Sequence, residues 1–499
     1  MQQLSLLPHI TSDYRHVARN EFSHQGLCDD SARNAIENRY TDLFQETDKF
    51  NRQLVSFQAN KTETLHSWFK YREGFSATLV ELLIDELGLQ AGETLLDPFA
   101  GSCTTLLVAK MFGINAVGVE LLPHCHLAWQ GKAAVFAYDL AELRHLRRQI
   151  EREALPSVAD KFPHLAITET AFEPSTEQDL MRYVRWFETL AVSEPTRTLL
   201  RLLVMSILEQ VSYTRKDGQY LRWDRRAGKM QANNARRIAR GNTPVQGIHK
   251  GPLPGVKESL LESLDKIIYD IARLQADRPP ASHQELLPGN ALHLLPTLAA
   301  GQIDGVITSP PYANRYDYTR TYALELAFLG VDQGIFDLRQ NLLSCTVENR
   351  SKEAALAEFY HTIGRDSFFT RVLAAVRKNP TLTEVNIALN KRNMRGEINN
   401  RGVLAMIDQY FTELAFVFAE LYRLCRPGAS VVFVNDNVRY AGEVIPVDTL
   451  STNLAETIGF IPHKIYVLPQ RKGNSSQQMG RYGREALRKS ITIWRKSES

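Results

Sequence analysis

The chain of 499 residues has few cysteines and no pattern among them. Its five thiols, Cys28, Cys103, Cys125, Cys345 and Cys425, are scattered along the sequence. They show neither the paired spacing of a disulfide framework nor that of a zinc site. The sequence therefore excludes a disulfide-stapled secreted domain, predicts no metal ion and favours a cytoplasmic location.

Long apolar runs are also absent. No run approaches the roughly eighteen residues of a membrane span, and the most apolar stretch, residues 199–208, is short and contains Arg201. The first thirteen residues lack the charged start and long apolar stretch of a signal peptide. We therefore expect no membrane association.

Two common nucleotide-binding loops are missing as well. No G-x-x-x-x-G-K-S/T loop is present, which argues against ATP-driven translocation, and no G-x-G-x-x-G follows an apolar run, which disfavours Rossmann-type NAD binding. We find no internal repeat and no nuclease motif. The length leaves room for one large domain with insertions or for two to three domains.

One segment with clear chemistry begins at Asp97, directly after the apolar run of residues 94–96 and before a helix expected over residues 104–112. An acidic, glycine-containing turn after a strand suits a nucleoside cofactor. Gly101 allows close approach of the backbone, and the helix N-terminus offers free amides to a carboxylate. A second apolar run, residues 116–119, ends at Glu120, where an acid can accept bonds from both ribose hydroxyls.

A second segment, Ser309-Pro310-Pro311-Tyr312, follows the apolar run of residues 305–307. It suits a planar base with an exocyclic amine, whose lone pair is conjugated with the ring and is a poor nucleophile. The Ser309 hydroxyl and the Pro310 carbonyl can accept bonds from that amine and free its lone pair. The prolines stiffen the turn, and Tyr312 offers an aromatic face to a base swung out of a duplex.

Together these motifs resemble the S-adenosylmethionine-dependent amino-methyltransferases of DNA. The resemblance implies an α/β fold of the class I methyltransferase type, a Rossmann-like, mostly parallel sheet with an antiparallel final strand and largely helical insertions. Residues 430–434 correspond to the fifth strand, and residues 465–468 and 490–494 to the closing antiparallel pair. It also implies S-adenosyl-L-methionine as cofactor and double-stranded DNA as substrate.

The resemblance also implies cofactor contacts. The segment before the helix expected over residues 77–87 corresponds to one that closes over the methionine end of the cofactor, and Asn290 stands where the family has an aspartate that contacts the adenine amine. We expect Asn290 to accept that bond through its amide oxygen. Cys103 replaces a family glycine, in what we expect to be the first helical turn. The predicted cofactor-binding residues are Tyr71, Phe75, Ser76, Asp97, Phe99, Gly101, Glu120 and Asn290.

The resemblance divides the chain into segments. Residues 57–135, 285–345 and 405–499 would form the catalytic domain, and residues 1–56 a helical N-terminal extension. Residues 136–284 would be an insertion for DNA recognition, with helices expected over 140–153, 198–212 and up to 276 around an irregular basic part. Residues 346–404 would be a second insertion.

Basic residues cluster although the net charge is only +3. Residues 215–240 hold nine Lys or Arg against two Asp, and further basic stretches occupy residues 391–395 and 471–489. Such loops suit phosphate contact and base readout. The alternative is that Trp223 anchors the first stretch in a core while Asp224 pairs internally. The predicted DNA-binding residues are Arg215, Lys216, Arg222, Trp223, Arg225, Arg226, Arg471 and Lys472.

Three functions remain open: a DNA amino-methyltransferase, an RNA base methyltransferase and a non-catalytic DNA-binding subunit. Methylation at cytosine carbon 5 is excluded, because the cysteine nucleophile of that family follows a proline and no Pro-Cys dipeptide occurs. RNA guanine enzymes usually carry Asp or Asn where Ser309 stands, and a degenerate subunit would be expected to lose Asp97, Glu120, Ser309 or Tyr312. These points favour the DNA enzyme.

Two features of the sequence indicate different target bases. Serine before Pro-Pro-Tyr is mostly found with cytosine-N4 methylation, whereas cytosine-N4 enzymes often place this segment before the glycine turn. We predict cytosine N4, with adenine N6 as the alternative. The enzyme would serve restriction-modification or phage defence, and a cognate restriction nuclease would be encoded separately.

Overall fold

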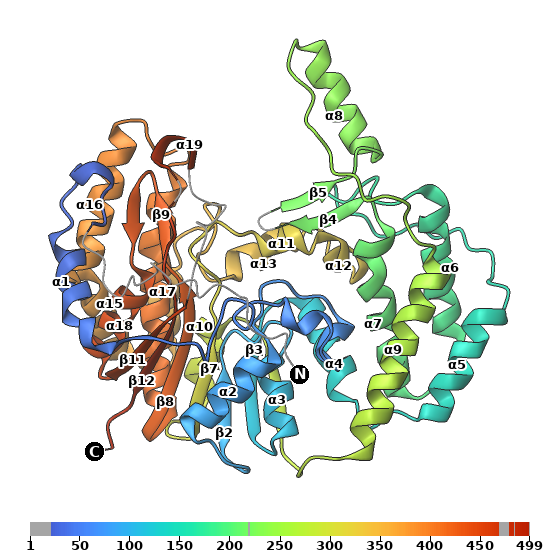
Figure 1. Cartoon of the computed structure of the whole chain (residues 1–499), viewed down its shortest axis with the longest axis horizontal. Helices are drawn as coiled ribbons and strands as arrows, with labels where there is room; N and C mark the ends of the chain where they lie inside the picture. The colour runs from blue at the N-terminus through green and yellow to red at the C-terminus, as the bar shows by residue number, and fades with distance from the viewer. Residues whose placement is uncertain (1–20, 218–219, 469–478, 484, 499) are drawn as a thin grey trace, which may run out of the picture.

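A computed structural model describes residues 21–217, 220–468, 479–483 and 485–498. Its centre is a sheet of eight strands in the order β1-β11-β12-β8-β7-β2-β3-β6 (Figure 1). The strands are β1 (Phe44–Glu46), β2 (Thr94–Asp97), β3 (Asn115–Glu120), β6 (Gln284–Pro288), β7 (Ile303–Thr308), β8 (Cys425–Asp436), β11 (Ile461–Leu468) and β12 (Lys489–Arg495). Only β12 runs antiparallel to its neighbours, β8 and β11. This confirms the mostly parallel sheet with an antiparallel final strand.

Helices cover both faces of this sheet because neighbouring strand residues point in opposite directions. Leu95 and Ile307 pack into a core with α2 (Ala77–Leu87) and α3 (Thr104–Met111). Leu96 and Val306 pack into a second core with α17 (Gly402–Leu424) and α18 (Val447–Ile458). Strands buried on both faces explain the continuous apolar runs of the sequence. In the described part of the chain, α17 alone has the length and composition to cross a membrane, and most of it is buried in the second core.

The insertion between β3 and β6 forms a helical lobe beside the sheet (Figure 1). It contains α5 (Leu140–Arg152), α6 (Pro174–Thr189), α7 (Glu194–Val211) and α9 (Val256–Ala276), and α4 (Pro123–Ala133) joins it to the sheet. The prediction that the basic part of this insertion is irregular is wrong. β4 (Thr214–Asp217) and β5 (Tyr220–Trp223) pair as an antiparallel hairpin, and α8 (Gly228–Ala239) follows.

The second insertion contains α14 (Glu353–Thr362), α15 (Asp366–Arg377) and α16 (Pro380–Met394). The prediction of a basic loop at residues 391–395 is also wrong, because most of this stretch lies in α16. Arg392 is only 3% exposed and pairs with Glu397 and Glu443. Since these carboxylates already neutralise it, Arg392 is not available for DNA phosphates.

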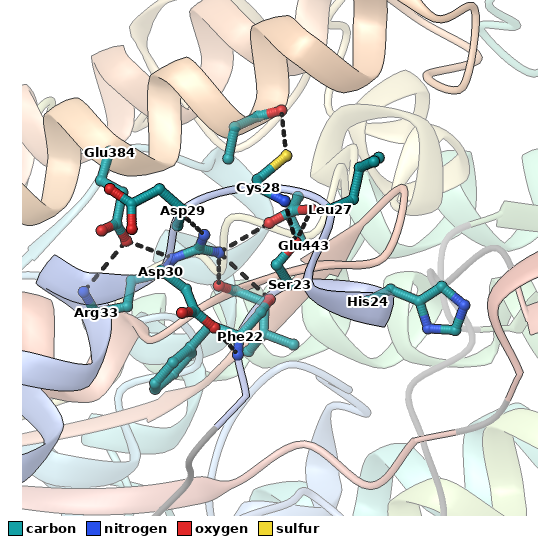
Figure 2. Close-up of polar contacts among 12 residues, drawn as sticks. Phe22, Ser23, His24, Leu27, Cys28, Asp29, Asp30, Arg33, Glu384 and Glu443 are labelled. Carbon is teal, nitrogen blue, oxygen red and sulfur yellow. Dashed lines mark hydrogen bonds and ion pairs between the residues drawn. The ribbon is translucent and has the colours of Figure 1, made fainter.

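The N-terminal segment packs against this second insertion. It contains α1 (Ser31–Arg39) and also β1, which pairs with β11 at the edge of the sheet. Figure 2 shows the fully buried Arg33 between Glu384 of α16 and Glu443 of β10 (Glu443–Ile445). The Arg33 Nε lies 2.8 Å from Oε1 of Glu384, and its Nη1 lies 3.1 Å from Oε2 of Glu443. Ser23 donates to the same Glu443 at 2.8 Å. Residues 22–46 are therefore an integral part of the second half of the fold.

Candidate active site

The turns after β2, β3, β6 and β7 line one cavity with about 730 Å³ of empty space. It lies where the strand order reverses, at the carboxyl ends of parallel strands, which is the usual place for a ligand in such sheets. Nine residues predicted from the sequence line it: Tyr71, Phe75, Asp97, Phe99, Gly101, Glu120, Asn290, Ser309 and Pro311. The structure thus brings together segments more than two hundred residues apart.

Asp97 ends β2 with its carboxylate fixed from two directions. Thr105 of α3 donates to Oδ2 at 2.7 Å, and Thr308 at the end of β7 donates to Oδ1 at 2.8 Å. The Phe99 amide adds a bond of 3.1 Å to Oδ1. Burial outweighs these donors and raises the pKa of Asp97 to about 6. A cation entering the cavity would stabilise the ionised form.

Glu120 ends β3 and binds backbone amides on either side. Gly101 donates to Oε2 and Leu122 to Oε1, both at 2.7 Å. Burial raises the pKa of Glu120 to about 7 despite these bonds. Gly101 has φ of +52°, and a Cβ there would lie 2.8 Å from the Tyr71 ring, so glycine is required for both reasons.

The position of Cys103 differs from the prediction. It is not in the first helical turn but is the N-cap residue of α3, in the left-handed region with φ of +62°. Glycine adopts this conformation without strain, which explains the glycine of the family pattern. Cys103 is fully buried and does not line the cavity.

Asn290 presents a donor rather than the expected acceptor. Its Oδ1 accepts a bond from the Leu292 amide at 2.9 Å and caps α10 (Ala291–Leu294). Its Nδ2 is buried and has no hydrogen-bond partner in the described structure. An unpaired buried donor is costly, so a ligand acceptor at this point of the cavity would complete the site.

Ser309 and Tyr312 are joined by their hydroxyls, with Ser309 donating to Tyr312 at 3.2 Å. Lys489 of β12 lies 5.1 Å from the Tyr312 ring centre, and its ammonium pairs with Asp436 at 3.1 Å. Burial would lower the pKa of Lys489, but Asp436 and Tyr312 raise it above its ordinary value. Lys489 therefore stays charged and holds one face of Tyr312.

Three predicted residues lie outside the cavity lining. Ser76 is fully buried and caps α2, accepting the Leu79 amide at 3.1 Å, so its hydroxyl is already used. Pro310 and Tyr312 belong to the same turn as Ser309 but do not line the cavity. Ser76 thus lies in the expected segment, but its side chain caps α2 and does not line the cavity.

Other lining residues were missed by the sequence analysis. Glu73 lines the cavity and accepts bonds from the hydroxyls of Tyr316 and Tyr322, and burial raises its pKa. Tyr322 in turn stacks on Tyr71, with ring centres 5.3 Å apart. The available signal was an acid in the segment before α2, which was expected to close over the cofactor, but the tyrosines come from beyond the Ser-Pro-Pro-Tyr turn.

Lys216 is wrongly predicted as a DNA contact. It is 2% exposed, pairs with Glu325 of α12 (Ala323–Phe328) and lies 4.5 Å from the Tyr322 ring centre. The alternation of side chains along β4 is the physical reason, since it turns Lys216 inward and its neighbour Arg215 outward. A count of charges along the sequence cannot distinguish these two directions.

The Asp224 region follows the alternative interpretation. Asp224 is fully buried and binds Arg226 through two contacts of 2.8 and 2.9 Å, which lower its pKa. Trp223 is partly buried against the first core. Asp224 therefore cannot read a base.

The remaining predicted DNA contacts lie at the surface or outside the described residues. Arg222 is exposed and pairs with Asp217 at 2.8 Å. Arg215 and Arg225 are exposed as well. Arg471 and Lys472 lie outside the described residues.

The fold and the site thus have the order of motifs and strands found in class I methyltransferases. A family model described as DNA methylase matches residues 12–129. The type II methyltransferase M.BsoBI of Geobacillus stearothermophilus is 53% identical over 478 residues, 95% of this chain and 94% of that protein. The type II methyltransferase M.AvaI of Anabaena variabilis is 38% identical over 483 residues, 93% and 92% of the two chains. The chain belongs to the N4/N6 amino-methyltransferases of DNA, in the type II group, a family that in general uses S-adenosylmethionine.

Proposed function

We propose that this enzyme transfers a methyl group from S-adenosylmethionine to N4 of cytosine in a specific sequence of double-stranded DNA. The observation that carries the proposal is Ser309, a neutral hydroxyl that lines the same cavity as Asp97 and follows β7, the strand next to β2. Adenine N6 is the second candidate, because the glycine turn precedes the Ser-Pro-Pro-Tyr turn in the chain.

The cavity residues fit the cofactor. Glu120 would accept bonds from the ribose hydroxyls, and Asp97 would lie near the cationic methionine end. The free Nδ2 of Asn290 would donate to a ring nitrogen of the adenine, which is an acceptor. When bound, S-adenosylmethionine supplies the methyl group as an electrophilic sulfonium.

The residues of the second turn would prepare the target amine. The Ser309 hydrogen is directed to Tyr312, so the oxygen's lone pairs remain free to accept a bond from the amine. The Pro310 carbonyl would accept from the second amine hydrogen. Two acceptors would favour a tetrahedral nitrogen and free its lone pair to act as a nucleophile. Tyr312, fixed by Lys489 on one face, would stack its other face on the flipped base.

Nucleoside mass spectrometry tests the target base directly. DNA from a methylation-deficient host expressing the chain should contain N4-methylcytosine, and expression of the Ser309→Ala variant should abolish most of it. Ser157→Ala, at an exposed serine in the insertion, is the matched control and should methylate normally. N6-methyladenine instead would support the second candidate, and no methylated base at all would refute the proposal.

We also propose a separately encoded restriction nuclease with the same recognition sequence, as the type II names of the relatives suggest. Methylated plasmid should then resist that nuclease, whereas plasmid from cells expressing Ser309→Ala should be cut.

A further inference from the structure

Helix α8 stands apart from the rest of the protein. It projects from the β4–β5 hairpin beyond the helical lobe (Figure 1), and none of its twelve residues is buried. Short helices without a packed face are marginally stable in water. A polar helix that is exposed nearly all round is therefore a candidate for contact with another molecule.

Among the described residues, the chain that returns from α8 covers one side of this helix. Asn234 donates to and accepts from the backbone of Val245, at 3.0 and 2.8 Å, and Arg237 donates to the Thr243 carbonyl at 2.8 Å. Met230 is also half-buried on this side. These contacts stiffen the helix and fix which face it presents outward.

One exposed side of α8, next to the covered side, carries a polar and basic stripe. Lys229, Asn233, Arg236 and Arg240 follow one another at steps of four, three and four residues, so they share one face of the helix. All four are exposed. Lys229 also donates to the Ala166 carbonyl at 2.8 Å, which ties the base of the stripe to the lobe. Ile238, the large exposed apolar residue of α8, lies on the opposite face.

The charged residues of α8 and of the chain on either side of it have one sign. Residues 225–257 contain eight Lys or Arg and no Asp or Glu. The hairpin that carries α8 contacts α11 (Tyr318–Thr321), the first helix after the Ser-Pro-Pro-Tyr turn. A helix of this size, about 18 Å long, fits the major groove of DNA, whose phosphates complement the charge.

We propose that α8 enters the major groove of the target duplex, with Arg236 and Arg240 holding phosphates and Asn233 reading a base edge. The proposal rests on the proposed DNA methylation. A face whose charged residues are all positive repels a second copy of the chain, whereas it attracts nucleic acid. Asparagine can grip adenine with two hydrogen bonds, which gives the stripe a way to recognise sequence.

A salt titration of DNA binding tests this assignment. The Arg236→Ala/Arg240→Ala double variant should lose at least about tenfold in affinity at physiological salt, and its logarithmic salt slope should fall by about 1.8, or 0.9 per contact. Asn233→Ala should methylate additional sequences. Cofactor affinity and the unfolding midpoint should stay unchanged, because these side chains are exposed.

The matched control is Arg144→Ala/Arg148→Ala, which removes two exposed charges from α5 and should leave DNA affinity and salt slope unaltered. If the α8 variant binds like the wild type, or loses no more than the α5 control, α8 does not contact DNA. Failure of the wild-type enzyme to methylate any DNA would instead overturn the proposed function.

Discussion

The Thr308 hydroxyl donates a hydrogen bond of 2.8 Å to Oδ1 of Asp97, although 211 positions separate the two residues. Asp97 ends the strand of the glycine turn, and Thr308 ends the neighbouring strand and precedes Ser309. The bond fixes the carboxylate at the end of β2 to the side chain at the end of β7, where the second turn begins. In the proposed function, this contact holds the cofactor-binding turn and the base-binding turn in a fixed position relative to each other.

Removal of this hydroxyl should therefore loosen the cofactor site. In Thr308→Val, Asp97 loses one of its three donors, and we expect cofactor binding to weaken by about 1–3 kcal/mol, as for a lost bond to a charged group. Calorimetry measures this directly. Thr457→Val, at an exposed threonine of α18, should bind like the wild type, and an equal effect in both variants would contradict the role of Thr308.

Cofactor affinity should depend on pH. Burial raises the pKa of Asp97 to about 6 and that of Glu120 to about 7. A cationic ligand binds best when both carboxyl groups are ionised. Binding therefore releases the protons that these groups carry, and it tightens as the pH rises from 5 to 8. Calorimetry in buffers of different ionisation enthalpy counts these protons. Glu120→Gln should flatten the upper part of the profile, and a profile independent of pH would disprove this assignment.

Asn290→Asp distinguishes donation from acceptance at the adenine. The variant keeps the cap on α10 through a carboxylate oxygen but loses the unpaired Nδ2. If Asn290 donates to a ring nitrogen, binding should weaken by about 1–3 kcal/mol. If the side chain instead accepts from the adenine amine, the carboxylate should bind equally well or better, which would restore the original prediction.

Lys216 should matter for stability and not for phosphate contact. Lys216→Met leaves Glu325 as a buried acid without its ammonium partner, a change that typically costs about 3–5 kcal/mol. Denaturant unfolding should show this loss, whereas the salt slope of DNA binding should stay at the wild-type value. Arg215→Met, on the outward side of the same strand, is the control and should be nearly neutral for stability.

The sequence predicted the strand ends well because the chemistry is local there. Asp97, Glu120 and Ser309 each follow a short apolar run, and parallel strands bring such ends together at one edge of the sheet. Features that depend on tertiary contacts could not be predicted from the sequence. The inward direction of Lys216, the left-handed cap at Cys103 and the exposed stripe of α8 depend on which side chains the fold covers, and a charge or a glycine replacement in the sequence carries no such information.

Single-turnover methylation by Ser309→Ala is the sharpest test of whether Ser309 acts on the target amine. If the Ser309 oxygen accepts a bond from the target amine in the transition state, the variant should transfer the methyl group roughly ten- to a thousand-fold more slowly. Its cofactor affinity should match that of the wild type, because the hydroxyl acts on the base. A wild-type rate of methyl transfer in Ser309→Ala would contradict the account.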